Sequence, residues 1–117
     1  MKILVLGGFS DDFEPGCDQE LFAKALGKAI VSKGHTLLNG CFNTFDNVVT
    51  EAAFEASESR EELDSHAVIQ SYVAKGAKPA HQFGRIRKLR ITSWDPGQEG
   101  WEIPEPIAEA DAVVIVG

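Results

Sequence analysis

The pattern of apolar and polar positions begins with a continuous apolar run from Ile3 to Leu6, which Gly7, Gly8, Phe9 and Ser10 follow. A run of this length bounded by glycine is typical of an interior strand of a parallel sheet. The glycine pair lets the backbone turn sharply and come close to a ligand. Because open α/β sheets bind ligands outside the carboxyl ends of their strands, this corner is the first candidate binding site.

Two helical patterns follow, separated by a second strand. The first helix is predicted from Asp18, a candidate N-cap, to Lys33-Gly34, and residues 35–40 predict the strand. The buried face of the first helix is assigned to Leu21, Phe22, Ala25, Leu26, Ala29 and Ile30. The second helix is capped by Asn43 or Thr44, and its face is assigned to Phe45, Val48, Val49, Ala52, Ala53 and Ala56.

The turn from Asn39 and Gly40 to Phe42, Asn43 and Thr44 joins the second strand to its helix. Such a turn leaves unpaired backbone N–H groups at a helix start, which form a ready anion site. The alternative is a well-formed connection that holds no ligand, and the turn by itself does not decide between them.

A third helix is predicted from the capping-box pattern at Ser59–Glu62 to Lys75-Gly76, and His66 is placed on its surface. Its apolar positions are Leu63, Ile69, Tyr72 and Val73. Further strands are predicted at residues 88–94 and 111–117.

Five of the eleven Lys and Arg residues gather between residues 78 and 90: Lys78, Arg85, Arg87, Lys88 and Arg90. An arginine here could hold a phosphate through forked hydrogen bonds, or the basic side chains could guard an edge strand. Trp94 could stack on a base or pack at a strand end.

Composition limits the class of protein. The chain has 117 residues, 44% hydrophobic and 25% charged, with a formal net charge of −7. It predicts a single domain over 1–117, and the negative charge argues against nucleic-acid and anionic-membrane partners. No leader or transmembrane pattern is visible, so a cytoplasmic location is expected. Cys17 and Cys41 lack metal-ligand spacing and are expected to be free thiols, and no cofactor is expected.

Two βα units and two further strands fit an α/β fold. They predict a Rossmann-like, doubly wound parallel sheet with a three-layer α/β/α arrangement. In chain order, the segments Ile3–Ser10, Leu26-Gly27, Lys33–His35, Asn39-Gly40 and Glu109–Gly117 resemble the SLOG superfamily. This Rossmann-like group includes the LOG or lysine-decarboxylase-like phosphoribohydrolases and the DprA-type domains.

The resemblance implies a nucleotide-derived ligand, such as an NAD- or ADP-ribose-like molecule, at the carboxyl edge of the sheet. Gly8, Phe9 and Ser10 would line its phosphate or sugar. The facing turn would contribute Gly40, Phe42, Asn43 and Thr44, and Arg85 or Arg87 would supply positive charge. The candidate site further includes Gly7, Asn39, Asp46, Trp94 and Gly117.

One departure from the family concerns the strand at Val113–Gly117. In the enzymes this strand continues into a second glycine-rich loop with a glutamate, whereas this sequence stops at the first glycine. We therefore expect a longer protein, or a partner or second copy that covers this strand.

Three functions follow as hypotheses. The first is a module that binds or senses a nucleotide derivative. The second is an N-glycosidase or deoxyribosyl-transferring enzyme, which would need a carboxylate such as Asp11, Asp12, Glu14 or Asp46. The third is an interaction subunit without a ligand.

Overall fold

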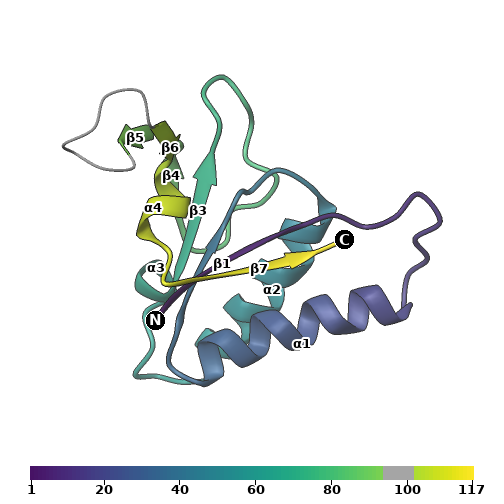
Figure 1. Cartoon of the computed structure of the whole chain (residues 1–117). Helices are drawn as coiled ribbons and strands as arrows, with labels where there is room; N and C mark the ends of the chain where they lie inside the picture. Colours follow the sequence, from purple (N-terminus) through teal and green to yellow (C-terminus); the bar gives the residue numbers. More distant parts are fainter. Residues whose placement is uncertain (94–101) are drawn as a thin grey trace.

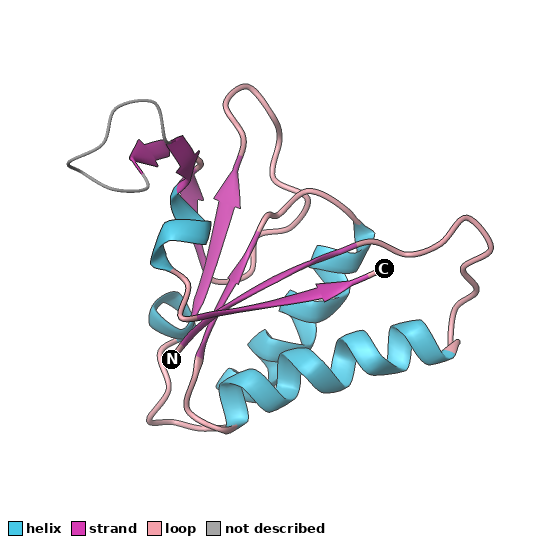
Figure 2. Ribbon diagram, in the orientation of Figure 1, coloured by secondary structure: helices cyan, strands magenta, loops and turns pink. Residues whose placement is uncertain are grey.

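The computed structural model describes residues 1–93 and 102–117, and its centre is a five-stranded, all-parallel sheet flanked by helices (Figures 1 and 2). The strand order is β4-β3-β2-β1-β7. The strands are β1 Lys2–Gly7, β2 Thr36–Asn39, β3 Ile69–Val73, β4 Arg85–Lys88 and β7 Ala112–Val116. In this register Val5 lies opposite Asn39 on one side and Val114 on the other.

The strand order reverses at β1, because the chain builds outward from β1 to β4 and then returns to place β7 on the other side of β1. The fold is therefore the Rossmann-like, doubly wound α/β sheet that the sequence predicts. The carboxyl ends of β1 and β7 meet at the reversal point, where ligands of such sheets bind.

Helices cover the two faces of the sheet unequally. The two long helices, α1 Asp18–Ser32 and α2 Thr44–Glu58, lie on one face, and the short α4 Glu105–Glu109 lies on the other (Figure 2). The remaining elements are α3 Ser65–Val68 and the antiparallel pair β5 Ile91–Ser93 and β6 Glu102–Pro104. No helix in the described ranges combines the length and the apolar character needed to cross a bilayer.

Strand pleating divides the core into two clusters, because successive side chains point to opposite faces. On the face of α1 and α2, Val5, Leu37 and Ile69 are buried against both helices. On the face of α4, the buried cluster is Leu4, Leu38 and Tyr72. Beyond this second cluster, Val113 and Ile115 of the outer strand β7 are exposed. The α4 face is therefore the less covered of the two.

The predicted buried face of α1 is confirmed only in part. Leu21, Phe22 and Ala25 are exposed, whereas Ile30 is buried and the partly buried Leu26 packs against the core. The buried positions that the prediction missed are Ala23, Gly27 and Val31. Glycine and alanine let α1 approach α2 more closely than large apolar side chains would. The predicted face of α2 is confirmed at the positions that are buried, Phe45, Val49, Ala53 and Ala56.

The helix predicted from Ser59 to Lys75 is wrong. Ser59 is the C-cap of α2, and the segment continues through the short α3 into the central strand β3. The strand predicted over residues 88–94 is divided, since β4 ends at Lys88 and β5 begins at Ile91. Trp94 lies outside the described residues.

The helix ends follow the predicted chemistry with one correction. Asn43 is the N-cap of α2, whereas Cys17 rather than Asp18 is the N-cap of α1. Gly34 follows α1 with a φ of +84°, as expected for a glycine beyond a helix end. Cys17 and Cys41 are both free.

Candidate functional site at the carboxyl edge of the sheet

The two glycine corners predicted from the sequence lie side by side at the carboxyl edge. Their link is Asn43, whose Nδ2 donates a 2.8 Å hydrogen bond to the carbonyl oxygen of Gly7. The amide of Gly8 donates to the carbonyl oxygen of Val116 at 3.3 Å, which places Gly117 beside it. The structure thus brings the ends of β1, β2 and β7 together.

A carboxylate of the chain itself occupies the amides of the second corner. Oδ2 of the buried Asp46 accepts hydrogen bonds from the amides of Phe42 at 2.8 Å and Asn43 at 3.2 Å. Burial raises the pKa of Asp46, and these two hydrogen bonds oppose the shift. The two amides are therefore satisfied without a ligand. Among the described residues, the next two amides of the helix start, those of Thr44 and Phe45, have no acceptor.

Asn39 belongs to a buried polar cluster and not to an open surface. Its Oδ1 accepts from the amide of Cys41 at 2.9 Å and from Nε2 of His81 at 3.1 Å. Its Nδ2 donates to Oγ of Ser71 at 2.9 Å. Asn39 therefore fixes the loop before β4 against the ends of β2 and β3. The same bonds support Cys41, whose φ of +48° is unusual for a residue with a side chain.

Cys41, His81 and Asn39 do not form a nucleophilic site. Sγ of the buried Cys41 lies 3.5 Å from the backbone oxygen of His81 and not from its ring. Both ring nitrogens of His81 are already used, because Nδ1 accepts from the amide of Phe83 at 3.2 Å. The histidine therefore has no free nitrogen to act as a base.

After the first corner, the chain packs back onto the core. The ring of Phe9 stacks on Phe13 with centroids 4.1 Å apart and meets Phe45 edge-on at 5.5 Å. The exposed Ser10 donates to Oε1 of Gln19 at 3.2 Å. Phe9 is thus engaged within the chain, whereas Phe42 on the facing turn is 80% exposed.

A cavity of about 280 Å³ opens beside these corners on the α4 face of the sheet. Leu4, Leu6 and Tyr72 contribute from the strands, while Pro106 and Ile107 contribute from α4. The turn side is formed by Gly40, Cys41 and Phe42, and the loop after β3 adds Ala74, Ala77 and Lys78. The cavity is mostly apolar, and Lys78 is the one charged side chain among its described lining residues.

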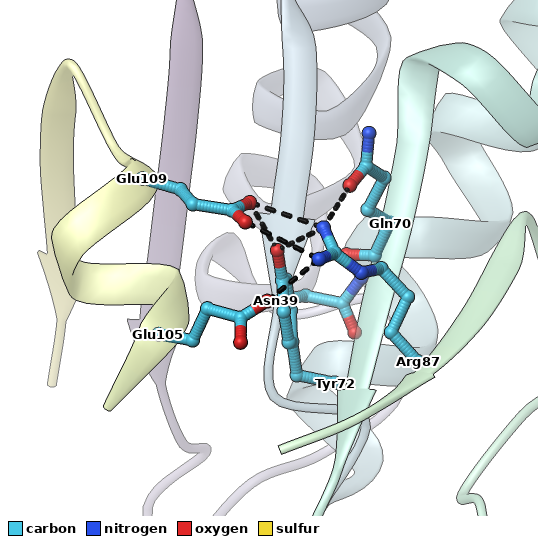
Figure 3. A network of polar contacts seen from close by, with 6 residues as sticks. All are labelled: Asn39, Gln70, Tyr72, Arg87, Glu105 and Glu109. Atoms are coloured by element: carbon cyan, nitrogen blue, oxygen red, sulfur yellow. Dashed lines mark hydrogen bonds and ion pairs between the residues drawn. The ribbon is translucent and has the colours of Figure 1, made fainter. Parts of the chain in front are cut away.

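An ionic cluster joins α4, which contributes to the cavity wall, to strands β3 and β4. Figure 3 shows its side chains. Arg87 of β4 donates from its two terminal nitrogens to Glu105 at 2.6 Å and to Glu109 at 3.1 Å and 3.2 Å. It also donates to the hydroxyl of Tyr72 at 2.6 Å, and its guanidinium lies 4.8 Å from the centre of that ring. Arg87 is therefore committed to α4 and is not free for a phosphate.

Tyr72 and Glu109 complete the cluster. The Tyr72 hydroxyl donates to Oε2 of Glu109. Burial, together with this hydrogen bond to a carboxylate, raises the pKa of Tyr72 well above its ordinary value. Burial also acts to raise the pKa of Glu109, but the hydrogen bonds from Tyr72 and Arg87 outweigh it and leave that pKa lowered. At neutral pH the cluster holds a neutral tyrosine between an arginine and carboxylates.

We expect Arg87→Met to lower the free energy of unfolding by about 2 kcal/mol, because Glu105 and Glu109 would lose their cation while remaining mostly buried. Urea unfolding at neutral pH measures the change. Arg85→Met is the matched control, since Arg85 is exposed two residues earlier on the same face of β4. It should change stability by less than about 0.5 kcal/mol. Equal effects of the two variants would show that the ionic cluster contributes nothing specific to the free energy of unfolding.

The other three basic residues of the segment 78–90 lie on or next to the outer strand β4. Arg85, Lys88 and Arg90 line a shallow hollow of about 330 Å³ together with Arg87 and Glu105. Because β4 is the last strand of the sheet on this side, basic side chains here match the edge-guarding alternative.

The sequence did not single out Tyr72, Glu105 and Glu109 as parts of one cluster, or Lys78 as part of the cavity lining. Tyr72 was assigned to a helix, so its position in a central strand was missed. No local pattern in the sequence pairs Arg87 with a helix that begins eighteen residues later.

Across residues 1–93 and 102–117, no group of three His, Cys, Asp or Glu side chains could hold a metal ion. No protein-family model, curated protein or solved structure matches the chain.

Proposed function

We propose that this domain binds a nucleotide-derived small molecule at the carboxyl edge of its sheet. The observation that carries the proposal is the apolar cavity beside the two glycine corners, at the point where the strand order reverses. A flat base would lie against Leu6 and Pro106. Phe42, which is largely exposed on the adjoining turn, would cover it.

The anionic end of the ligand would interact with Lys78, and not with Arg87, and it would extend toward the Gly8 corner. Gly8 has room for such an approach, since the nearest atom to a Cβ built there is Nδ2 of Asn43 at 3.7 Å. The cavity and the Gly8 corner share the Phe42-Asn43 turn as a wall. A ligand could therefore extend from one to the other.

The enzyme hypothesis has less support. Glycosidic chemistry needs a carboxylate near the reacting carbon, and no Asp or Glu lines the cavity among the described residues. Asp46, one of the predicted carboxylates, is buried and accepts hydrogen bonds from two backbone amides. A binding or sensing role requires no such group.

We expect Phe42→Ala and Gly8→Val to leave the free energy of unfolding within about 0.5 kcal/mol of wild type and to weaken binding of a base-containing ligand about tenfold or more. Phe42 contributes little to the core, and a Cβ at Gly8 meets no atom closer than Nδ2 of Asn43 at 3.7 Å. Calorimetry and thermal shift with NAD, ADP-ribose, cyclic ADP-ribose, AMP and adenosine measure binding, since a ligand raises the melting temperature by mass action.

Gly7 supplies the contrast with Gly8. A Cβ at Gly7 would lie 2.3 Å from the carbonyl oxygen of Val116, so Gly7→Ala should disturb the pairing of β1 with β7.

Lys78→Glu should weaken the binding of anionic ligands specifically, and Lys75→Glu is its control outside the cavity. Failure of every ligand in the panel to shift the melting temperature would remove the proposal in favour of an interaction subunit.

A further inference from the structure

A groove of about 520 Å³ lies between α1 and α2. It lies on the helical face of the sheet, opposite the proposed ligand cavity. Its apolar lining consists of small or short side chains: Ala25, Val48, Ala52 and Ala56. Leu21, one turn before Ala25, is 56% exposed. Apolar positions thus extend along the outer side of a helix pair whose inner side already packs on the sheet.

The two sides of the groove carry opposite charges. Lys24 and Lys28 line it from α1, and Glu51 and Glu55 line it from α2. Lys24 pairs with Glu20 of its own helix at 2.9 Å. Within the part of the chain that the structure describes, Lys28, Glu51 and Glu55 make no ion pair. At the groove, α1 therefore presents lysines and α2 presents glutamates.

We propose that this groove binds the same groove of a second copy of this chain. The two helices run in the same direction, because each returns from the carboxyl edge of the parallel sheet. A two-fold axis parallel to them would place α1 of one copy over α2 of the other. The lysines of each copy then face the glutamates of its mate.

The same charges exclude the other symmetric arrangement. A two-fold axis across the helices would place α1 over α1 and α2 over α2, so that like charges would meet. The small side chains at Ala25 and Ala52 allow the helices of a second copy to approach closely, as in a four-helix bundle. A dimer of this kind leaves the ligand cavity open, because that cavity lies on the opposite face.

Sedimentation equilibrium over a concentration series tests the proposal with two charge-reversed double variants. One carries Lys24→Glu and Lys28→Glu, and the other carries Glu51→Lys and Glu55→Lys. Each should self-associate about tenfold more weakly than wild type or worse. An equimolar mixture of the two should recover the association, since opposite charges then face each other. A misfolded variant would not show this recovery.

Glu58→Lys is the matched control, because Glu58 is exposed on α2 but does not line the groove. It should leave association unchanged. A wild-type chain that stays monomeric through the series would overturn the proposal. So would a dimer that persists in both double variants, or one that is lost in Ile115→Lys on the outer strand β7 and not in the groove variants.

Discussion

Replacing Gly27 by alanine should lower the free energy of unfolding by about 3 kcal/mol, although in an ordinary helix the same change stabilises by about 1 kcal/mol. Gly27 is buried where α1 meets α2. A Cβ there would lie 2.0 Å from the carbonyl oxygen of Val49 and 3.3 Å from the amide nitrogen of Ala53. Both atoms are backbone, so no side-chain rotation relieves the contact, and the helices must separate.

Chemical unfolding of Gly27→Ala measures this loss. Gly8→Ala is the matched glycine control, because a Cβ at Gly8 meets nothing closer than 3.7 Å. It should change stability by less than about 0.5 kcal/mol. A Gly27→Ala variant as stable as wild type, or more stable, would mean that the helices are not in backbone contact at this point.

Gly27 also explains why the buried face of α1 could be predicted only in part from its apolar positions. Such a prediction gives weight to large side chains, and it therefore selected Leu21 and Phe22. Close approach of two helices depends instead on small side chains, here Ala23 and Gly27. Which small residues face a neighbour is decided by the neighbour, and the α1 sequence contains no information about α2.

The strands and helices that the sequence predicted well are those in which the spacing of apolar residues fits only one kind of secondary structure. The run at Ile3–Leu6 is too short and too apolar for an amphipathic helix, and glycine bounds it. The segment that became β3 is different, since Ile69, Tyr72 and Val73 fit the spacing of a helix as well as a buried strand. Its parallel pairing with β2 and β4 on its two sides decides the outcome.

At the site, the meeting of the two glycine corners followed from topology, because parallel strands end at one edge. The hydrogen bonds from the amides of Phe42 and Asn43 to Asp46 could have been predicted from the local sequence. Asn43 and Asp46 stand three residues apart at a helix start, and they form the reciprocal hydrogen bonds of a capping box. The contacts of Arg87 with α4 had no such signal, since they depend on the long return of the chain to β7.

His81 should make the protein less stable as the pH falls from about 6.5 to about 4. Burial lowers the pKa of His81 from 6.5 to about 4 in the folded protein. Nδ1 accepts a hydrogen bond from Phe83, so a proton there would meet another donor. Between the two pKa values the unfolded chain binds more protons, and the free energy of unfolding should therefore fall by about 3 kcal/mol in total. Above pH 6.5 the full stability is present.

Urea unfolding of wild type and His81→Gln across this pH range isolates the effect, because every other group titrates in both proteins. Glutamine retains a donor toward Asn39 but takes up no proton. The His81→Gln variant should therefore lose about 2–3 kcal/mol less stability than wild type as the pH falls to about 4. His66→Gln is the control for the substitution itself, since His66 is exposed, and it should leave the free energy of unfolding at pH 7 within about 0.5 kcal/mol of wild type. An unchanged slope in His81→Gln would mean that His81 is protonated in the folded protein without cost, and that its contacts with Asn39 and Phe83 do not hold it neutral.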